Sequence, residues 1–299
     1  IFFFFHSNKE KTGNSFFWLS KETSILVNNW FMMYFLSVVL IGTIYPIFLE
    51  VLTSNKISVG PPFYNKLILP FLIPFLFAMA IGPRLKWVKS DIQNKLYMLM
   101  LLIISFLISA LIIKKFNVNF LMNTILVSSA FFLFFVTLRE FFIKKLKNLS
   151  QNIAHFGFSL LILSILLNNI FSTEVITNLK IGETFKSDKF SISFANINQE
   201  NGKNFKSIIG KFKVEHEDGS IDALEPELRI YNQPNIVTSE ADIKTNFFTD
   251  KFITMNYVQN QEYFNIRYQV KPLMIWIWIS VLLLSFGGLM SIFKKRYEI

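Results

Sequence analysis

One histidine, His155, lies inside a segment that is otherwise suited to lipid, Asn152 to Asn168, with the sequence NIAHFGFSLLILSILLN. An imidazole at membrane depth is costly without a partner, so His155 is a candidate for binding a proton partner or a metal. The small neighbours Ala154 and Gly157 would let a flat ligand approach the helix backbone, which suits a heme pocket. On a helix the same face carries Phe158, Ser159, Ile162 and Leu166.

The alternative interpretation of His155 is a histidine near a helix end that hydrogen-bonds a neighbouring carbonyl or a water molecule. Lone histidines are more often satisfied in this way than bound to a metal. From the local sequence alone, both interpretations stay open.

The other two histidines give weaker signals. His216 lies in VEHEDG at an expected hairpin turn, where a metal site is conceivable but an exposed acidic turn is the better account. His6 directly follows the opening IFFFF and is expected at the lipid headgroup level without a special role. Glu225 and Glu227 would point to the same side of a strand, and without a nucleophile or cleft they are interpreted as solvated surface.

Several classes of chemistry have no support in the sequence. There is no GxSxG, HExxH, Walker or GxGxxG pattern, so hydrolase, zinc protease and nucleotide-binding functions are not indicated. The chain has no cysteine, which excludes structural disulfides, CxxC redox chemistry and thiolate-ligated zinc or iron–sulfur sites.

The composition predicts the elements that must position these residues. Of the 299 residues, 52% are hydrophobic, and the mean hydropathy is +0.43. A soluble single core does not need so much apolar content, so we expect a polytopic α-helical membrane protein. The opening IFFFF resembles the tail of a hydrophobic segment already under way, so we expect a truncated chain or one product of a split gene.

The hydropathy pattern divides the chain into four parts. Residues 1–24 are expected to form the end of a preceding transmembrane helix and a cytoplasmic loop. Residues 25–171 contain five expected spans, each compared with a hydrocarbon core of about 30 Å. Residues 172–271 have a soluble composition, and residues 272–299 form a last span with a basic tail. The five earlier spans are expected at about 25–49, 67–82, 96–113, 120–143 and 153–171.

The positive charges indicate orientation in the membrane. Alternating the spans puts the basic clusters near Arg84, Lys144 and Lys294 on one face, which the positive-inside rule makes cytoplasmic, or matrix-facing in an organelle. The net charge of +10 therefore belongs to membrane topology. Because the basic residues are scattered at helix ends, no nucleic-acid partner is expected.

The segment 172–271 is expected to be a small extracytoplasmic antiparallel β domain tethered to the membrane at both ends. Alternating or β-branched runs predict strands, and EDGS and ENGK predict turns between them. The expected strands cover Phe190–Phe194, Ile208–Val214, Glu227–Tyr231 and Phe264–Val270.

A second unusual stretch, SVGPPFYN at Ser58 to Asn65, is expected to follow a rigid, non-helical path just outside the membrane. Its Phe63 and Tyr64 suit either an aromatic-belt turn or a platform for a hydrophobic ligand or partner. In the last span, Gly287 and Gly288 would permit close helix packing.

Several motifs in order resemble the C-terminal half of the CcmF family, the membrane subunits of the cytochrome c maturation heme lyase. They are GTIYP, ISVGPPFYN, IGPRLKW, AHFGFS, LRIYN, SEADI and KPLMIWIW followed by GG, and the resemblance covers essentially the whole chain. It implies a role in a heme lyase complex of the holocytochrome c synthase type, which attaches heme covalently to apocytochrome c.

The resemblance also implies cofactors, partners and a location. Through the AHFGFS motif it makes His155 an axial iron ligand of a membrane b-type heme (heme b), and no catalytic residue is assigned. The implied partners are the N-terminal half of the same protein, CcmH-type and CcmE-type maturation proteins, apocytochrome c and membrane lipid. The implied location is the bacterial inner membrane, or the mitochondrial inner membrane if the chain is organelle-encoded, with the β domain on the periplasmic or intermembrane side.

This chain departs from the family pattern because the tryptophan-rich WWD segment, the other transmembrane histidine and the external histidine pair are absent from it. Two rival functions therefore stay open. One is a non-catalytic assembly scaffold of the same pathway. The other is a transporter or permease subunit, which predicts several polar residues around a cavity at the membrane midplane, with Ser105 and Ser109 as candidates.

Overall fold

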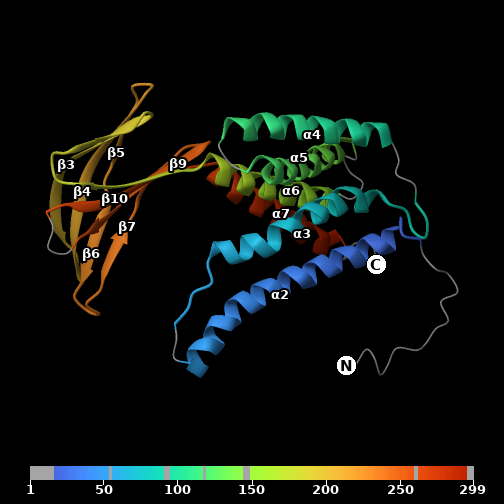
Figure 1. Ribbon diagram of the computed structural model, residues 1–299, viewed down its shortest axis with the longest axis horizontal. Helices are drawn as coiled ribbons and strands as arrows, with labels where there is room; N and C mark the ends of the chain where they lie inside the picture. Colours follow the sequence, from blue (N-terminus) through green and yellow to red (C-terminus); the bar gives the residue numbers. More distant parts are fainter. Residues whose placement is uncertain are drawn as a thin grey trace. The chain divides into compact units, whose positions relative to one another are not determined.

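The computed structural model describes residues 17–53, 56–90, 95–116, 119–143, 149–258 and 262–294 (Figure 1). His6, the opening IFFFF, the lysines at 144, 145 and 147, and the basic residues after Lys294 lie outside the described residues. The chain forms two compact units. The first is Ile1–Ser159 with Gly287–Ile299, and the second is Leu160–Phe286.

The described part of the chain contains six helices that are long and apolar enough to cross a membrane. This confirms the predicted polytopic α-helical membrane protein with a β domain. The short 3-10 turn η1 (Gly82–Arg84) follows the second of these helices. The helices are α2 (Lys21–Thr53), α3 (Pro61–Ile81), α4 (Lys95–Lys115), α5 (Phe120–Ile143), α6 (Leu149–Phe171) and α7 (Met274–Lys294).

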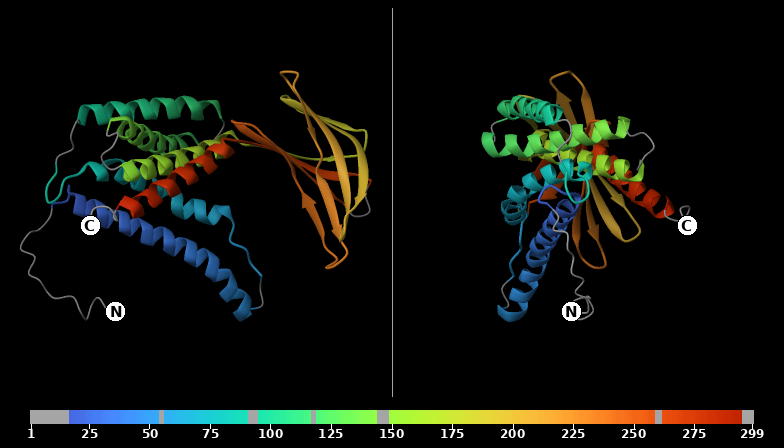
Figure 2. Two further views of the ribbon diagram at one scale, coloured as in Figure 1. Left: turned by 180° about the vertical axis from the view of Figure 1, so that it is seen from behind. Right: turned by 90° about the vertical axis from the view of Figure 1, so that its right-hand side faces the viewer.

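In the first unit, α3 lies between α2 and α5, and α4 packs on the other side of α5 (Figure 2). Aromatic side chains fill the α2–α3 contact: the ring centroids of Tyr34 and Phe71 are 4.3 Å apart. The Tyr34 hydroxyl also donates to the Leu67 carbonyl oxygen at 2.9 Å. Because this hydroxyl is satisfied by helix backbone, a polar group is accommodated between two apolar helices.

The SVGPPFYN stretch follows the expected non-helical path only as far as Gly60, and the expectation is wrong for its last five residues. Helix α3 begins at Pro61, with Gly60 as its N-cap and prolines in its first two positions. Proline is well suited to the first turn, because the backbone N–H groups there have no partner within the helix. Tyr64 packs on α2 at Gly42, where a Cβ would lie 2.6 Å from the tyrosine hydroxyl. These residues therefore belong to the helical packing.

The second unit contains a β-sandwich in which every strand pairing is antiparallel. One sheet has the order β1-β10-β9-β8, and the other has the order β2-β3-β4-β6-β7 with β5 paired to β4. The strands are β1 (Thr173–Leu179), β2 (Thr184–Lys186), β3 (Phe190–Asn201), β4 (Phe205–His216), β5 (Ile221–Leu224), β6 (Glu227–Tyr231), β7 (Val237–Glu240), β8 (Asp242–Thr245), β9 (Thr249–Tyr257) and β10 (Phe264–Pro272).

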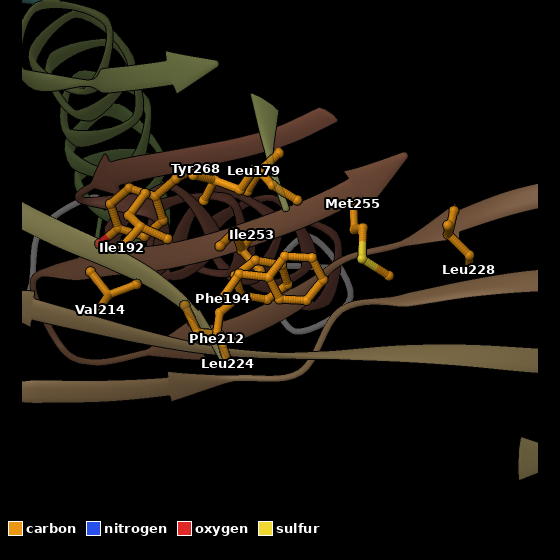
Figure 3. Packing of buried hydrophobic residues seen from close by; sticks show 11 residues of the cluster. Leu179, Ile192, Phe194, Phe212, Val214, Leu224, Leu228, Ile253, Met255 and Tyr268 are labelled. Carbon is orange, nitrogen blue, oxygen red and sulfur yellow. The ribbon is translucent and has the colours of Figure 1, made fainter. Parts of the chain in front are cut away.

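The core of the sandwich is built from the inward-facing residues of both sheets (Figure 3). Phe194 and Phe212 are directly opposite each other on β3 and β4, and their rings stack 4.3 Å apart. From the other sheet, Ile253, Met255 and Tyr268 are almost completely buried. The alternation predicted from the sequence therefore places one side of each strand in a shared core.

The first and last strands of the sandwich are each connected directly to a membrane-spanning helix. Strand β1 follows α6 directly, β10 leads directly into α7, and β1 and β10 are neighbours, with Thr173 opposite Val270. The Asn168 side chain donates a hydrogen bond to the Pro272 carbonyl. The end of α6 and the start of α7 are thus held together where the domain begins.

Candidate functional site

His155 is the seventh residue of α6, on the second turn of the helix. Its side chain is half-buried, and among the described residues no group is hydrogen-bonded to its imidazole ring. The interpretation in which a neighbouring carbonyl satisfies this histidine therefore has no support within the described part of the chain.

The imidazole contributes to the wall of a cavity of about 300 Å³. Three elements meet there: the start of α2, the end of α3 with η1, and the start of α6. This volume is at the lower end of the range for small-molecule sites, about 300–1,000 Å³. The lining residues share a mixture of small, apolar and polar side chains and are Lys21, Ser24, Ile25, Asn28, Ala78, Met79, Gly82, Pro83, Gln151 and His155.

Gly82 explains how α2 and α3 approach each other at this cavity. A Cβ at Gly82 would overlap the Ser24 hydroxyl, so only glycine leaves room for the α2 side chain. The glycine of the IGPRLKW motif is therefore a packing requirement at the wall of the site. Lys21, also at the wall, places its ammonium 5.0 Å from the centre of the Trp87 ring.

A largely buried ion pair lies in the same helical unit. Arg84 Nε donates to Glu140 Oε1 at 2.9 Å, and the two side chains are 18% and 13% exposed. Arg84 also contacts the Met98 sulfur and the Val136 carbonyl, so it connects η1 to α4 and α5. The pair thus places a fixed charge arrangement in the same unit as the candidate ligand.

The face of α6 that carries His155 is fixed by its neighbours. Ser159 is buried and shares a hydrogen bond of 2.8 Å with Thr137 of α5, so this hydroxyl is used between helices. The Phe158 ring lies 6.1 Å from that of Phe75 on α3. Both residues were expected on the His155 face, and both serve to pack α6 against the bundle.

Ala154 does not offer its backbone to a flat ligand as the sequence suggested. A Cβ at Gly287 would lie 2.6 Å from the Ala154 backbone nitrogen, so α7 covers that position. Of the two glycines in α7, Gly287 makes the close helix contact, whereas Gly288 has open space beside it. The Ala154 backbone is therefore closed to a flat ligand.

His216 is part of a polar cluster between the two sheets. It was expected in an exposed acidic turn, and this expectation is wrong for its side chain, because the side chain is only 16% exposed. Its Nε2 atom lies 2.8 Å from Asp222 Oδ2 and 2.9 Å from Lys251 Nζ. The Lys251 ammonium is thus at hydrogen-bond distance from Nε2, and the described residues contain no group of three or more potential metal ligands.

The acidic pair Glu225 and Glu227 is also accounted for, and only Glu227 belongs to β6. Glu227 Oε2 accepts hydrogen bonds from Arg229 and Ser207, each at 2.9 Å. The Arg229 hydrogen bond, opposed by partial burial and assisted by Ser207, holds the pKa of Glu227 below its usual range. Glu225 is exposed, so the two carboxylates do not share a site.

Most residues of the cavity wall were not predicted from the sequence. Gln151 was placed outside the helix because α6 was expected to begin at Ile153, whereas it begins at Leu149. With the longer helix, Gln151 lies one turn before His155 on the same face, a spacing that could have identified it. Lys21 and Asn28 carry no such signal, because their proximity to His155 depends on how α2 packs.

Comparison with known proteins gives consistent matches along the chain. Residues 170–272 match a family model described as the CcmF C-terminal beta-sandwich. The chain is 29% identical to the cytochrome c-type biogenesis protein CcmF of Pseudomonas fluorescens, over 94% of this chain and 44% of the relative. With CcmF of Haemophilus influenzae it shares 27% identity, over 93% of this chain and 46% of the relative.

A solved structure entitled "Cytochrome c Heme Lyase CcmF" has the same fold, with a TM-score of 0.68 at 20% identity. The match covers 91% of this chain and 46% of that structure. The chain thus spans about half the length of the curated relatives it matches.

Six apolar helices in the described part of the chain, with a β-sandwich between the last two, define a multi-pass membrane protein that is similar to cytochrome c biogenesis proteins. Within that class, the chain is similar over most of its length to the C-terminal half of CcmF proteins, and residues 170–272 match the CcmF C-terminal beta-sandwich. The predicted resemblance to the C-terminal half of CcmF is confirmed.

Proposed function

We propose that this chain forms the C-terminal part of a cytochrome c heme lyase and that His155 is an axial ligand of a membrane b-type heme. The observation that carries the proposal is the position of His155 on a cavity wall, without a hydrogen bond to any other described residue. The family match supports a role in heme handling.

The residues around His155 fit a heme in their chemistry. A neutral imidazole is a common axial ligand, and the small side chain of Ala78 leaves space for a planar group beside apolar side chains such as Met79. Lys21 would supply a positive charge for a propionate, and Asn28 and Gln151 would supply amide groups. A cavity of about 300 Å³ is small for a whole porphyrin, so we propose that the remaining part of the site comes from the other half of the lyase.

The residues of this chain would hold the ligand and fix its environment. His155 would donate an electron pair from one ring nitrogen, and the α5 and α3 contacts of Ser159 and Phe158 would keep its helix from rotating. The Arg84–Glu140 pair would set the local electrostatic potential, one of the factors that tune a heme. Bound heme would supply one-electron exchange.

The same proposal gives the sandwich its side of the membrane. With the basic ends of α3 and α7 facing the cytoplasm or matrix, the segment between α6 and α7 would lie in the periplasm or intermembrane space of the inner membrane. CcmE-type and CcmH-type proteins and apocytochrome c would then meet the complex on this side.

The test is a reduced-minus-oxidised visible spectrum of the chain purified together with the other half of the lyase. We expect His155→Ala to lose or shift a b-type absorbance, because it removes the iron ligand. His216→Ala, which alters a histidine held by Asp222 in the sandwich, should leave that absorbance unchanged.

Two other results would overturn the proposal. An unchanged spectrum in His155→Ala would remove this residue from the ligand set. A wild-type complex with no heme would instead favour the assembly scaffold. The transporter alternative receives less support, because the polar residues of the cavity lie near helix ends, and Ser105 and Ser109 bond to carbonyls of their own helix.

A further inference from the structure

The turn between β8 and β9 projects beyond the end of its sheet toward the start of α7. In the β9–β10 pairing, Thr249 is opposite Pro272, the last residue of β10. The turn residues Asn246, Phe247 and Phe248 therefore lie past the sheet, level with the first turn of α7. The candidate span begins there, at Met274.

Contacts hold the turn against this helix. The Phe247 ring lies 5.0 Å from the Trp276 ring in an edge-to-face arrangement. The Leu273 backbone N–H donates to the Phe248 carbonyl at 2.7 Å. The Asn246 side chain closes the turn by accepting hydrogen bonds from the backbone N–H groups of Phe248 and Thr249, at 3.0 and 2.7 Å.

Leu273 shows how firmly this junction is determined. Its φ is +62°, a left-handed conformation that is unfavourable for a residue with a side chain. Its carbonyl accepts the first backbone hydrogen bonds of α7, from Trp276 and Ile277. The chain thus changes from strand to helix at Leu273, and the backbone hydrogen bond from Leu273 to Phe248 connects this residue to the β8–β9 turn. The same hydrogen bond places the turn beside the first residues of α7.

The tip of the turn is apolar and accessible. Phe247 is 51% exposed and Phe248 is 64% exposed, although both would be expected to bury if a protein surface were available. The tip carries no charge. On β9 and β10, Asp250 and Lys271 are opposite each other one position behind Thr249 and Pro272, and on β8 Lys244 is two residues before Asn246.

We propose that this β8–β9 turn inserts its two phenylalanines into the interfacial layer of the bilayer beside α7. Aromatic side chains at the end of a spanning helix partition into the headgroup region, where their apolar rings leave water. We infer that lipid surrounds the two exposed rings, because the turn contacts Leu273 and Trp276 where the candidate span of α7 begins. The turn would act as a second anchor that sets the height of the sandwich, independently of heme binding.

The test uses the absence of cysteine in the chain, which makes single-cysteine labelling unambiguous. A spin label at Phe248→Cys, in the full chain in lipid nanodiscs, should be more accessible to oxygen than to a water-soluble nickel chelate. Two controls have similarly exposed native side chains: Ile243→Cys, further back on β8, and Ile181→Cys, beyond the far end of β1. Both controls should favour the nickel chelate.

A label at Phe248 with the same accessibility as the label at Ile181 would overturn the proposal, including the case in which a protein partner covers the turn. A second variant, Thr245→Cys, leaves both phenylalanines in place. A fluorophore there should be quenched by lipids that carry a nitroxide on the headgroup. An absence of quenching would also overturn the proposal.

Discussion

Tyr268 is a fully buried side chain of the sandwich core whose hydroxyl has no hydrogen-bond partner among the described residues. Its ring is in edge-to-face contact with Phe190, at 5.0 Å, so the aromatic part is well packed. Burial, together with the nearby Asp222 carboxylate, raises the pKa of Tyr268 above its usual range. The hydroxyl therefore stays neutral and contributes only a cost of desolvation.

We expect Tyr268→Phe to raise the free energy of unfolding of the sandwich by about 1 kcal/mol, because it removes an unsatisfied buried hydroxyl and keeps the ring. Hydrogen exchange of the β9 and β10 amides in the full chain would measure the change. Tyr257→Phe is the matched control, since Tyr257 is 56% exposed and should show no change. A loss of protection in Tyr268→Phe would mean that the hydroxyl has a stabilising partner.

Single residues also show what the sequence could reveal of the site. His155 was identified because an imidazole in an apolar helix is conspicuous from local sequence alone. Its surroundings were not, because Ser24 and Gly82 are more than 70 positions away and reach the cavity through helix packing. The hydrogen bond between Ser159 and Thr137 could not be predicted either, because it depends on the rotation of α5 against α6.

At the scale of elements, the contact between α6 and α7 depends on one glycine. We expect Gly287→Ala to destabilise the helical unit by about 1–3 kcal/mol, because its Cβ would overlap the α6 backbone at Ala154. Gly288→Ala is the control, because a Cβ there meets open space. Thermal unfolding in detergent would compare the two variants. Equal melting temperatures would show that α7 does not pack on α6 at Gly287.

The two sheets of the sandwich are linked by a buried carboxylate. Asp222 on β5 accepts hydrogen bonds from Lys244 of β8 at 2.6 Å and from Lys251 of β9 at 2.7 Å. These lysines are opposite each other in the pairing of β8 with β9, so they would repel without the carboxylate. Burial opposes ionisation, but the bonds from Lys244, Lys251 and His216 prevail and hold the pKa of Asp222 well below its usual range.

This arrangement predicts acid sensitivity. The pKa of Asp222 is lower in the folded than in the unfolded chain. Its contribution to the free energy of unfolding is therefore complete at a pH well above the usual pKa of 3.8, and it declines as the pH falls below 3.8. Asp222→Asn should cost about 3 kcal/mol at neutral pH, because two lysines lose a buried partner. The difference from wild type should shrink on acidification. Hydrogen exchange of β5 and β9, corrected for intrinsic rates, would measure it, and a difference independent of pH would contradict the assignment.

At the scale of the whole molecule, the six spans and the β domain followed from local patterns, because hydropathy and strand alternation depend on neighbouring residues. The missed features depend on longer range. Strand β9 supplies core residues Ile253 and Met255 but was not predicted, and the Asp222 cluster combines four strands from both sheets. The start of α3 was missed because the prolines of SVGPPFYN were taken as helix breakers, although proline suits the first helical turn.

The alternation of spans makes a prediction about the two faces of the membrane. Helix α6 runs from the cavity region to β1, and α7 begins directly after β10, so the whole sandwich should be on one side. Trp87, which follows α3 and is 58% exposed, should be on the other side with the basic ends. In intact cells or mitoplasts, a membrane-impermeant maleimide should label Ile181→Cys but reach Trp87→Cys only after permeabilisation. Labelling of both sites from one side would mean that α4, α5 and α6 do not all cross, because an odd number of spans must separate these two positions.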